Sequence, residues 1–292
     1  MFFDILITAL PAGCVYALVA ASFNILYRPT NVFNFAQGDL VMLGAMLFVT
    51  LRATGWMPWP LALLLSVAAA GLLAVAIERI AVAPMLRRST HSHGWIITTL
   101  AVSMIIANAS GKVWGSDPVP VSAPFGLSTE PTLIAGLLIP SYQVALVVFT
   151  VLLVTATELL YQTRTGRAVL GVAENRDTAL LRGINPATLS IVSFFIGGAL
   201  AGLTGYLASP ILFASTSLGG ALLLKGFAAA ALGGLGSNRG ALAAGLLIGL
   251  TESTSSTFLP AGYQNAVILA VVLTVLLVRP QGISGNVHAR AV

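Results

Sequence analysis

The sequence predicts an all-α protein of the polytopic transmembrane class, a bundle of about nine membrane-spanning helices. Its composition predicts the class, because apolar residues make up 57% of the 292 residues and charged residues only 8%, against about 25% charged in an ordinary soluble domain. The mean hydropathy is +0.95. A soluble fold of this size needs many more charges to cover its surface. The apolar residues also fall into runs long enough to cross a bilayer as helices.

The spans follow from the length of these apolar runs, since a bilayer core about 30 Å thick requires roughly 20 residues of helix. The predicted spans are 2–27, 35–54, 60–83, 94–114, 139–161, 188–209, 218–236, 240–258 and 264–279. The count ranges from eight to ten for two reasons. The span 35–54 opens with polar residues, and 218–236 contains Lys225 and many glycines, which is typical of a broken or re-entrant helix. Two glycine pairs, Gly198 with Gly202 and Gly245 with Gly249, have the GxxxG spacing that lets helices approach closely in lipid. We expect residues 1–292 to form a single transmembrane domain.

The orientation follows from the arginines in the short loops. Arginines concentrate in 79–93, in 162–187 and in the C-terminal tail, whereas the loop 115–138 has two acidic residues, four prolines and no Lys or Arg. Basic loops lie on the cytoplasmic side. Nine crossings then place the N-terminus outside and the C-terminus in the cytoplasm, with eleven of the fourteen basic residues on the inner side.

The longest cytoplasmic segment, 162–187, is predicted to contain a short amphipathic helix over about 173–182. Gly183 can adopt the left-handed conformation that ends a helix, and Pro186 blocks continuation. Charged residues alternate along this segment and face the cytosol, while Ala179, Leu180 and Leu181 offer an apolar contact. Two interpretations stand: a solvated loop helix, or a docking helix for a soluble partner.

Polar residues inside the predicted spans are costly in lipid and tend to mark pathways. One cluster is Asn31, Asn34, Gln37 and Asp39, and a second group includes Thr98. Asn34 and Gln37 either tie a broken helix to its neighbours or contact substrate. Glu252 requires a partner, for which Lys225 is the candidate. That pair would be either a structural tie or a substrate-gating element.

Enzyme chemistry finds little support in the sequence. No P-loop is present, because Gly111-Lys112 is followed by Val113, and the glycine-rich run 233–240 lacks the GxGxxG spacing. The single cysteine, Cys14, excludes an intrachain disulfide. The histidines, His91, His93 and His288, do not form a convincing metal site. We therefore expect no catalytic residue, metal or cofactor in this chain, and the scattered basic residues do not indicate nucleic-acid binding.

Six motifs occur in the same order along the chain as in one family of permeases. They are Pro11–Leu18, Asn31–Leu40, Ile77–Arg79, Thr165–Asn185, Ala231–Ser237 and Arg279–Gly282. Together they resemble the LivH/LivM-type permeases of ABC importers, closest to the LivH subunit, over nearly the whole chain. Gln37 and Asp39 depart from the histidine and glutamate that are usual in the second motif.

The resemblance implies a permease subunit of a binding-protein-dependent importer in the bacterial inner membrane. Its substrate would be a small polar or amphipathic solute, such as a branched-chain amino acid or a related carboxylate or amide. Its partners would be two cytoplasmic ATPase subunits that bind ATP–Mg, an extracytoplasmic solute-binding protein, and a second permease that is either a LivM-like paralogue or another copy of this chain. The resemblance assigns ATPase coupling to the cytoplasmic segment, at Glu174, Arg176, Asp177, Ala179, Leu180 and Gly183.

Two alternatives belong to other classes. A secondary transporter driven by an ion gradient should show inverted repeats and paired acidic residues at the midplane, but the sequence shows no convincing repeat. A membrane-embedded hydrolase would need a nucleophile and a base in matching spans, and no histidine lies in any predicted span.

Overall fold

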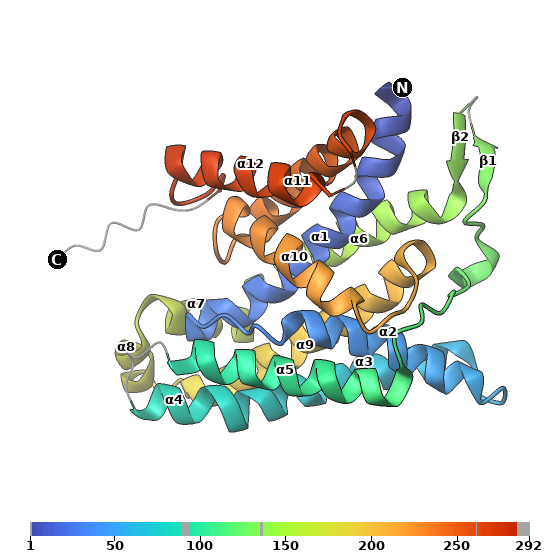
Figure 1. Ribbon diagram of the computed structural model, residues 1–292. Coiled ribbons are helices and arrows are strands. Elements are labelled where there is room, and N and C mark those ends of the chain that lie inside the picture. Colours follow the sequence, from blue (N-terminus) through green and yellow to red (C-terminus); the bar gives the residue numbers. More distant parts are fainter. Residues whose placement is uncertain (1, 89–93, 135–136, 261, 285–292) are drawn as a thin grey trace.

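The computed structural model describes residues 2–88, 94–134, 137–260 and 262–284, and these are predominantly helical (Figure 1). The helices are α1 (Phe2–Thr30), α2 (Gln37–Ala53), α3 (Trp59–Ile77), a π-helix (Glu78–Val82), α4 (Ala83–Arg88), α5 (Gly94–Trp114), a 3-10 turn (Pro124–Gly126), α6 (Ser141–Gln162), α7 (Arg164–Glu174), α8 (Arg176–Leu181), α9 (Pro186–Leu212), α10 (Leu218–Gly233), α11 (Asn238–Phe258) and α12 (Gln264–Val278). The prediction of a helical bundle is confirmed.

A helix occurs in each of the nine predicted ranges, but only five segments of the described chain are long and apolar enough to cross a membrane by length and composition. They are Ile5–Thr30, Trp59–Leu86, Gly94–Trp114, Ser141–Gln162 and Pro186–Leu212. Two more apolar helices, α10 and α12, are shorter, with 16 and 15 residues. The prediction that 218–236 is a broken or re-entrant helix is wrong in its first alternative, since α10 runs unbroken through Lys225 and its glycines.

Helix α1 lies at the centre of the bundle and packs against α11, α9 and α10. The predicted GxxxG pairs are where helix backbones meet. A Cβ atom added at Gly245 would lie 2.6 Å from the backbone nitrogen of Ala17 on α1, and one added at Gly249 would meet Gly13. Gly198 and Gly202 on α9 meet Ala74 and Ala70 on α3 in the same way. Small residues therefore set the distance between the central helices.

The chain between α1 and α2, residues 31–36, is not helical. Asn31 has a φ of 54°, in the left-handed region that asparagine tolerates better than most residues. Phe33 leaves this segment and stacks on Tyr27, with ring centroids 4.7 Å apart, and it meets Phe227 of α10 edge-on at 5.2 Å. The aromatic contacts hold the irregular segment against α10, which explains why α2 begins at Gln37, later than the predicted position 35.

The connection between α5 and α6 contains a β-hairpin that the all-α prediction missed. Strands β1 (Pro131–Ile134) and β2 (Leu137–Pro140) pair antiparallel, with Thr132 opposite Ile139. The predicted span 139–161 therefore begins too early, because apolar length alone does not distinguish the end of a strand from the start of a helix. Figure 1 shows the hairpin and the first turns of α1 toward one end of the molecule, with α4, α7 and α8 at the opposite end.

Candidate functional site

The predicted coupling helix is two helices rather than one. Asn175 interrupts it in an extended conformation, with φ −153°, and the Asn175 Oδ1 atom accepts a hydrogen bond of 2.9 Å from the Thr178 N–H at the start of α8. Asparagine is among the best residues at this capping position. The helix predicted over about 173–182 therefore begins too early: α8 starts at Arg176, because Asn175 caps it and separates it from α7.

The end of α8 agrees with the prediction. Gly183 has a φ of +77°. The Ile184 N–H donates to the Ala179 carbonyl at 3.0 Å, and the Gly183 N–H donates to the Leu180 carbonyl at 2.9 Å. These two bonds form a Schellman motif, which satisfies the last carbonyls of the helix. Pro186 is then the first residue of α9. The short helix α8 is therefore capped at both ends and fixed between α7 and α9.

The apolar residues of α8 divide into two groups. Ala179 is buried against Val169, Val172 and Leu189 of the same chain, so it is not available to a partner. Leu180 and Leu181 are 52% and 89% exposed. Among the polar residues assigned to coupling, Glu174 and Asp177 are exposed and Arg176 is half-buried. A cavity of about 380 Å³ is lined by Glu174, Asn175, Thr178 and Arg182, among others.

Asn34 and Gln37 are fully buried and hydrogen-bonded inside the chain. Gln37 Nε2 donates to Ser22 Oγ on α1 at 3.0 Å and to the Gly197 carbonyl on α9 at 3.1 Å. Asn34 Nδ2 donates to Gln37 Oε1 at 3.4 Å, and Asn34 Oδ1 accepts from the Ala36 N–H at 3.1 Å. These bonds tie the start of α2 to α1 and α9, and neither side chain reaches a surface of this chain.

Asp39 and Thr98 have different surroundings. Asp39 lies in the first turn of α2, faces Ser103 of α5 and is 6% exposed; its Oδ2 atom has no hydrogen-bond partner in the described part of the chain. Thr98 Oγ1 donates to the Ala81 carbonyl at 3.0 Å. Ala81 belongs to the π-helix, where the regular bonding pattern of the backbone changes. Thr98 therefore supports that irregular turn.

Glu78 opens the π-helix and is a buried polar residue that the sequence reasoning did not place among the site residues. Its Oε1 atom accepts a hydrogen bond of 2.8 Å from Ser190 Oγ on α9, and its Oε2 atom lies 3.8 Å from Arg79 Nε. The Ile77–Arg79 motif contains Glu78 and could have indicated that this residue has a role. The sequence does not, however, identify Ser190 as its partner.

Lys225 and Glu252 form an ion pair, as the sequence suggested, and Tyr16 is its unexpected third member. Lys225 on α10 donates to Glu252 Oε1 on α11, and the Tyr16 hydroxyl on α1 donates to Glu252 Oε2. Lys225 Nζ lies 3.1 Å from the Tyr16 hydroxyl oxygen and 5.1 Å from the Tyr16 ring centroid. We define Tyr16, Lys225 and Glu252 as the charged triad. It joins three central helices at a position where an unpaired charge would be costly.

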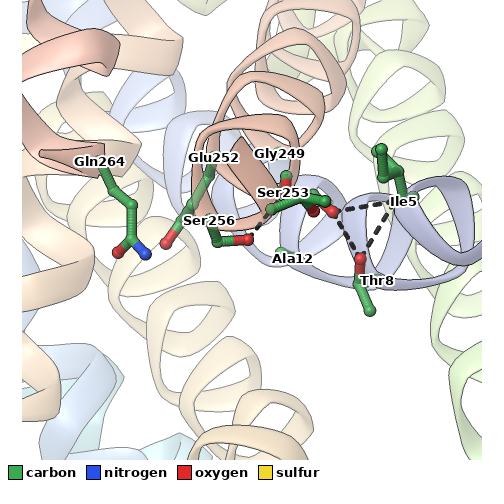
Figure 2. Close-up of a pocket in the computed structure, with 9 residues that line it drawn as sticks. Ile5, Thr8, Ala12, Gly249, Glu252, Ser253, Ser256 and Gln264 are labelled. Carbon is green, nitrogen blue, oxygen red and sulfur yellow. Dashed lines mark hydrogen bonds between the residues drawn. The ribbon is translucent and has the colours of Figure 1, made fainter. Parts of the chain in front are cut away.

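A cavity of about 440 Å³ lies beside the triad (Figure 2). Helices α1 and α11 form its walls, Gln264 comes from the start of α12, and Glu252 is one of the lining residues. Within it the Thr8 and Ser253 hydroxyls are hydrogen-bonded to each other, and Ser253 Oγ also donates to the Ile5 carbonyl at 3.0 Å. We call this the α1–α11 pocket. It offers hydroxyl, amide and carboxylate groups to a small polar molecule.

The described residues contain no group of three His, Cys, Asp or Glu side chains that could hold a metal ion. His91, His93 and His288 lie outside the described residues. The polar groups inside this apolar helical bundle form two kinds of site, a charged triad beside a cavity and a short capped helix with exposed leucines. These features fit a membrane transport protein.

Comparison with known proteins identifies the family. The chain belongs to the family described as the permease component of the branched-chain amino acid transport system, whose model matches residues 5–276. It is 29% identical to the high-affinity branched-chain amino acid permease LivH of Escherichia coli K12, over 94% of this chain and 92% of that protein. It is 30% identical to the permease BraD of Pseudomonas aeruginosa, over 96% and 95%. No solved structure matches the chain.

The family and the apolar helices together establish the general role. The chain is the permease subunit of an ABC importer, a multi-pass protein of the inner membrane, and it is a transport subunit rather than an enzyme. An ion-gradient-driven carrier, the alternative from the sequence, has no support from these relatives.

Proposed function

We propose that this permease carries a branched-chain amino acid, or a related small carboxylate or amide, and that α7 and α8 couple it to two cytoplasmic ATPases that bind ATP–Mg. A solute-binding protein would deliver the substrate from outside, and the substrate would cross between this chain and a second permease. The substrate class is supported by the relatives, which are named as branched-chain amino acid permeases. The chain has no P-loop of its own, so force must reach it through a contact.

The observation that carries the coupling proposal is the exposed apolar end of a rigid short helix. Leu181 is 89% exposed on α8, although the helix is capped at both ends and held against α7 and α9. An exposed leucine on such a polar segment can enter a cleft of a partner with little loss of conformational entropy, because contacts within the permease already order the helix. Around that contact lie the other residues assigned to coupling, Glu174, Arg176, Asp177, Leu180 and Gly183. Ala179 holds the helix in place from its buried side.

We further propose that nine segments cross the membrane in one domain, with the N-terminus outside. The crossings would be α1, α2, α3 with α4, α5, α6, α9, α10, α11 and α12. The proposal is supported by the gathering of α4, α7 and α8 at one end of the bundle (Figure 1), because these helices and their flanks carry most of the arginines and basic segments stay in the cytoplasm. The shorter α10 packs against α1, α2 and α11 rather than standing alone in lipid.

The coupling proposal is tested with Leu181→Glu in the assembled transporter. The permease is co-expressed with its ATPases and second permease, reconstituted in vesicles, and assayed for ATP hydrolysis stimulated by the binding protein. We expect Leu181→Glu to lower the stimulated rate at least about tenfold, since a buried unpaired charge in the contact costs several kcal/mol. The control Leu235→Glu changes a leucine that is 42% exposed, in the turn after α10, and should retain most of the activity.

If Leu181→Glu hydrolyses ATP and moves solute as the parent does, α8 is a solvated loop helix and the contact lies elsewhere. If the parent complex imports no branched-chain amino acid but imports another solute, the substrate assignment is wrong and the coupling assignment is still tested by the same pair of variants.

A further inference from the structure

Glu252 differs from the buried carboxylates Asp39 and Glu78 because its side chain is accessible from a cavity. The Asp39 and Glu78 side chains are almost entirely covered. The Glu252 side chain is 20% exposed and the Lys225 side chain 19%, and Glu252 lines the α1–α11 pocket. Of the two residues of the pair, Glu252 is the one that lines the cavity, so its carboxylate is accessible to a small molecule there.

The pocket has the size and the lining of a small-molecule site. Its volume of about 440 Å³ falls within the range of about 300–1,000 Å³ that such sites have. Thr8, Ser256 and Gln264 add hydroxyl and amide groups around Glu252, and Ala12 and Gly249 leave an apolar floor. Figure 2 shows Glu252 and Gln264 extending toward the same part of the pocket.

The charged triad is complementary to a zwitterion. Glu252 accepts one bond from Lys225 and one from Tyr16, each on a different oxygen, which leaves each oxygen with further acceptor capacity. An amino acid carries an ammonium group and a carboxylate on the same carbon. Its ammonium can replace Lys225 on Glu252 while its carboxylate takes the freed Lys225, so that no charge is left unpaired during the exchange. Tyr16 keeps Glu252 in place as this happens.

We propose that the α1–α11 pocket is a transit site for a zwitterionic amino acid. Glu252, which lines the pocket, binds the ammonium group, and Lys225, which is bonded to Glu252 but does not line the pocket, moves to take the carboxylate. The proposal rests on the proposed function for the existence of an amino acid substrate, and adds where in this chain that substrate pauses. The pocket opens at the surface of the chain, where Thr8, Ser256 and Thr257 are exposed. A substrate can therefore enter the pocket from the face formed by α1, α11 and α12.

The first experiment fills the pocket without touching the triad. Ser256→Leu places a leucine in the pocket, whereas Thr254→Leu replaces an exposed hydroxyl residue of the same helix that does not line it. Both are assayed in the assembled transporter in vesicles for amino acid uptake and for ATP hydrolysis. We expect Ser256→Leu to lower uptake at least about tenfold while hydrolysis stays within about twofold of the parent. Thr254→Leu should leave both unchanged.

The second experiment separates a structural tie from substrate contact by exchanging the charges. The double variant Glu252→Lys with Lys225→Glu keeps an ion pair between α10 and α11, so a purely structural role predicts normal assembly and normal uptake. The transit-site proposal predicts normal assembly with uptake lowered at least about tenfold. In the variant, the ammonium group of the substrate would meet a lysine at position 252, and its carboxylate a glutamate at position 225. The single variant Glu252→Gln retains a partner for Tyr16 and should also lose uptake.

Normal uptake by Ser256→Leu or by the charge exchange would overturn the transit site and leave the proposed function intact. Absence of amino acid uptake by the parent complex, with uptake of another solute, would instead reject the proposed substrate. Equal loss in Ser256→Leu and Thr254→Leu would show that α11 tolerates no enlargement and that the pocket has no special role.

Discussion

At the residue scale, polar side chains in the bundle fall into two groups: sealed ones, which are buried and hydrogen-bonded within the chain, and reachable ones, which are accessible from a cavity. Gln37 is sealed: its amide nitrogen bridges Ser22 and the Gly197 carbonyl, which joins three helices at one point. Glu252 is reachable from a cavity. The sequence places both residues in spans but does not distinguish them, because burial depends on which helices surround each residue. Sequence reasoning proposed the Lys225–Glu252 pair from charge alone, and it missed Tyr16, which lies 209 positions from Lys225.

We predict that Gln37→Leu destabilises the permease without changing its substrate preference. The change leaves the Gly197 carbonyl and the Ser22 hydroxyl without their donor in a fully buried position, which costs about 1–3 kcal/mol. The measurement is thermal unfolding of the purified protein in detergent, together with uptake normalised to folded protein. The control Asn108→Leu alters an exposed amide of α5 and should leave the unfolding temperature nearly unchanged. A changed substrate preference in Gln37→Leu would instead place Gln37 on the pathway.

At the element scale, the segment 162–187 shows how capping overrides a simple amphipathic pattern. The sequence correctly predicted the end of the helix, because Gly183 is a recognisable stop signal. It did not predict the break at Asn175, because an asparagine within a charged run can be either a capping residue or a solvated residue inside a helix. The hydrogen bond from the Thr178 N–H to Asn175 Oδ1 decides between the two. The β1–β2 hairpin was missed for a related reason, because its apolar residues adjoin those of α6.

We predict that Asn175→Ala weakens coupling, whereas Asn175→Asp preserves it. Alanine cannot accept the bond from the Thr178 N–H, and loss of such a cap costs about 0.5–2 kcal/mol, enough to unwind a helix of six residues part of the time. Aspartate caps as well as asparagine does. The measurement is binding-protein-stimulated ATP hydrolysis in the reconstituted transporter. Equal stimulation in all three proteins would show that α8 does not need to be preformed.

At the scale of the whole molecule, contacts between small residues hold α1 at the centre of the bundle. Lipid tails are as apolar as the side chains, so burial gives little drive for helices to associate, and close backbone approach takes over. The GxxxG spacings were visible in the sequence, and the structure confirms them as contact points. The identity of the partners was not visible, because Gly245 and Ala17 are brought together only by the complete path of the chain.

We predict that Gly245→Ala separates α1 from α11 and disturbs the charged triad between them. The added Cβ would lie 2.6 Å from the Ala17 nitrogen and 2.7 Å from its Cα, and backbone atoms cannot yield as a flexible side chain can. Overpacking of this kind costs about 1–3 kcal/mol. Gly220→Ala on α10 is the matched control, since nothing lies within 4 Å of a Cβ there. Thermal unfolding in detergent should show a clearly lower unfolding temperature for Gly245→Ala and not for Gly220→Ala. Because the contact lies seven positions before Glu252 on the same helix, uptake should fall further than the folded fraction does. Equal stability of the two variants would mean that α1 can shift along α11, and that the spacing of these helices is not what positions the triad.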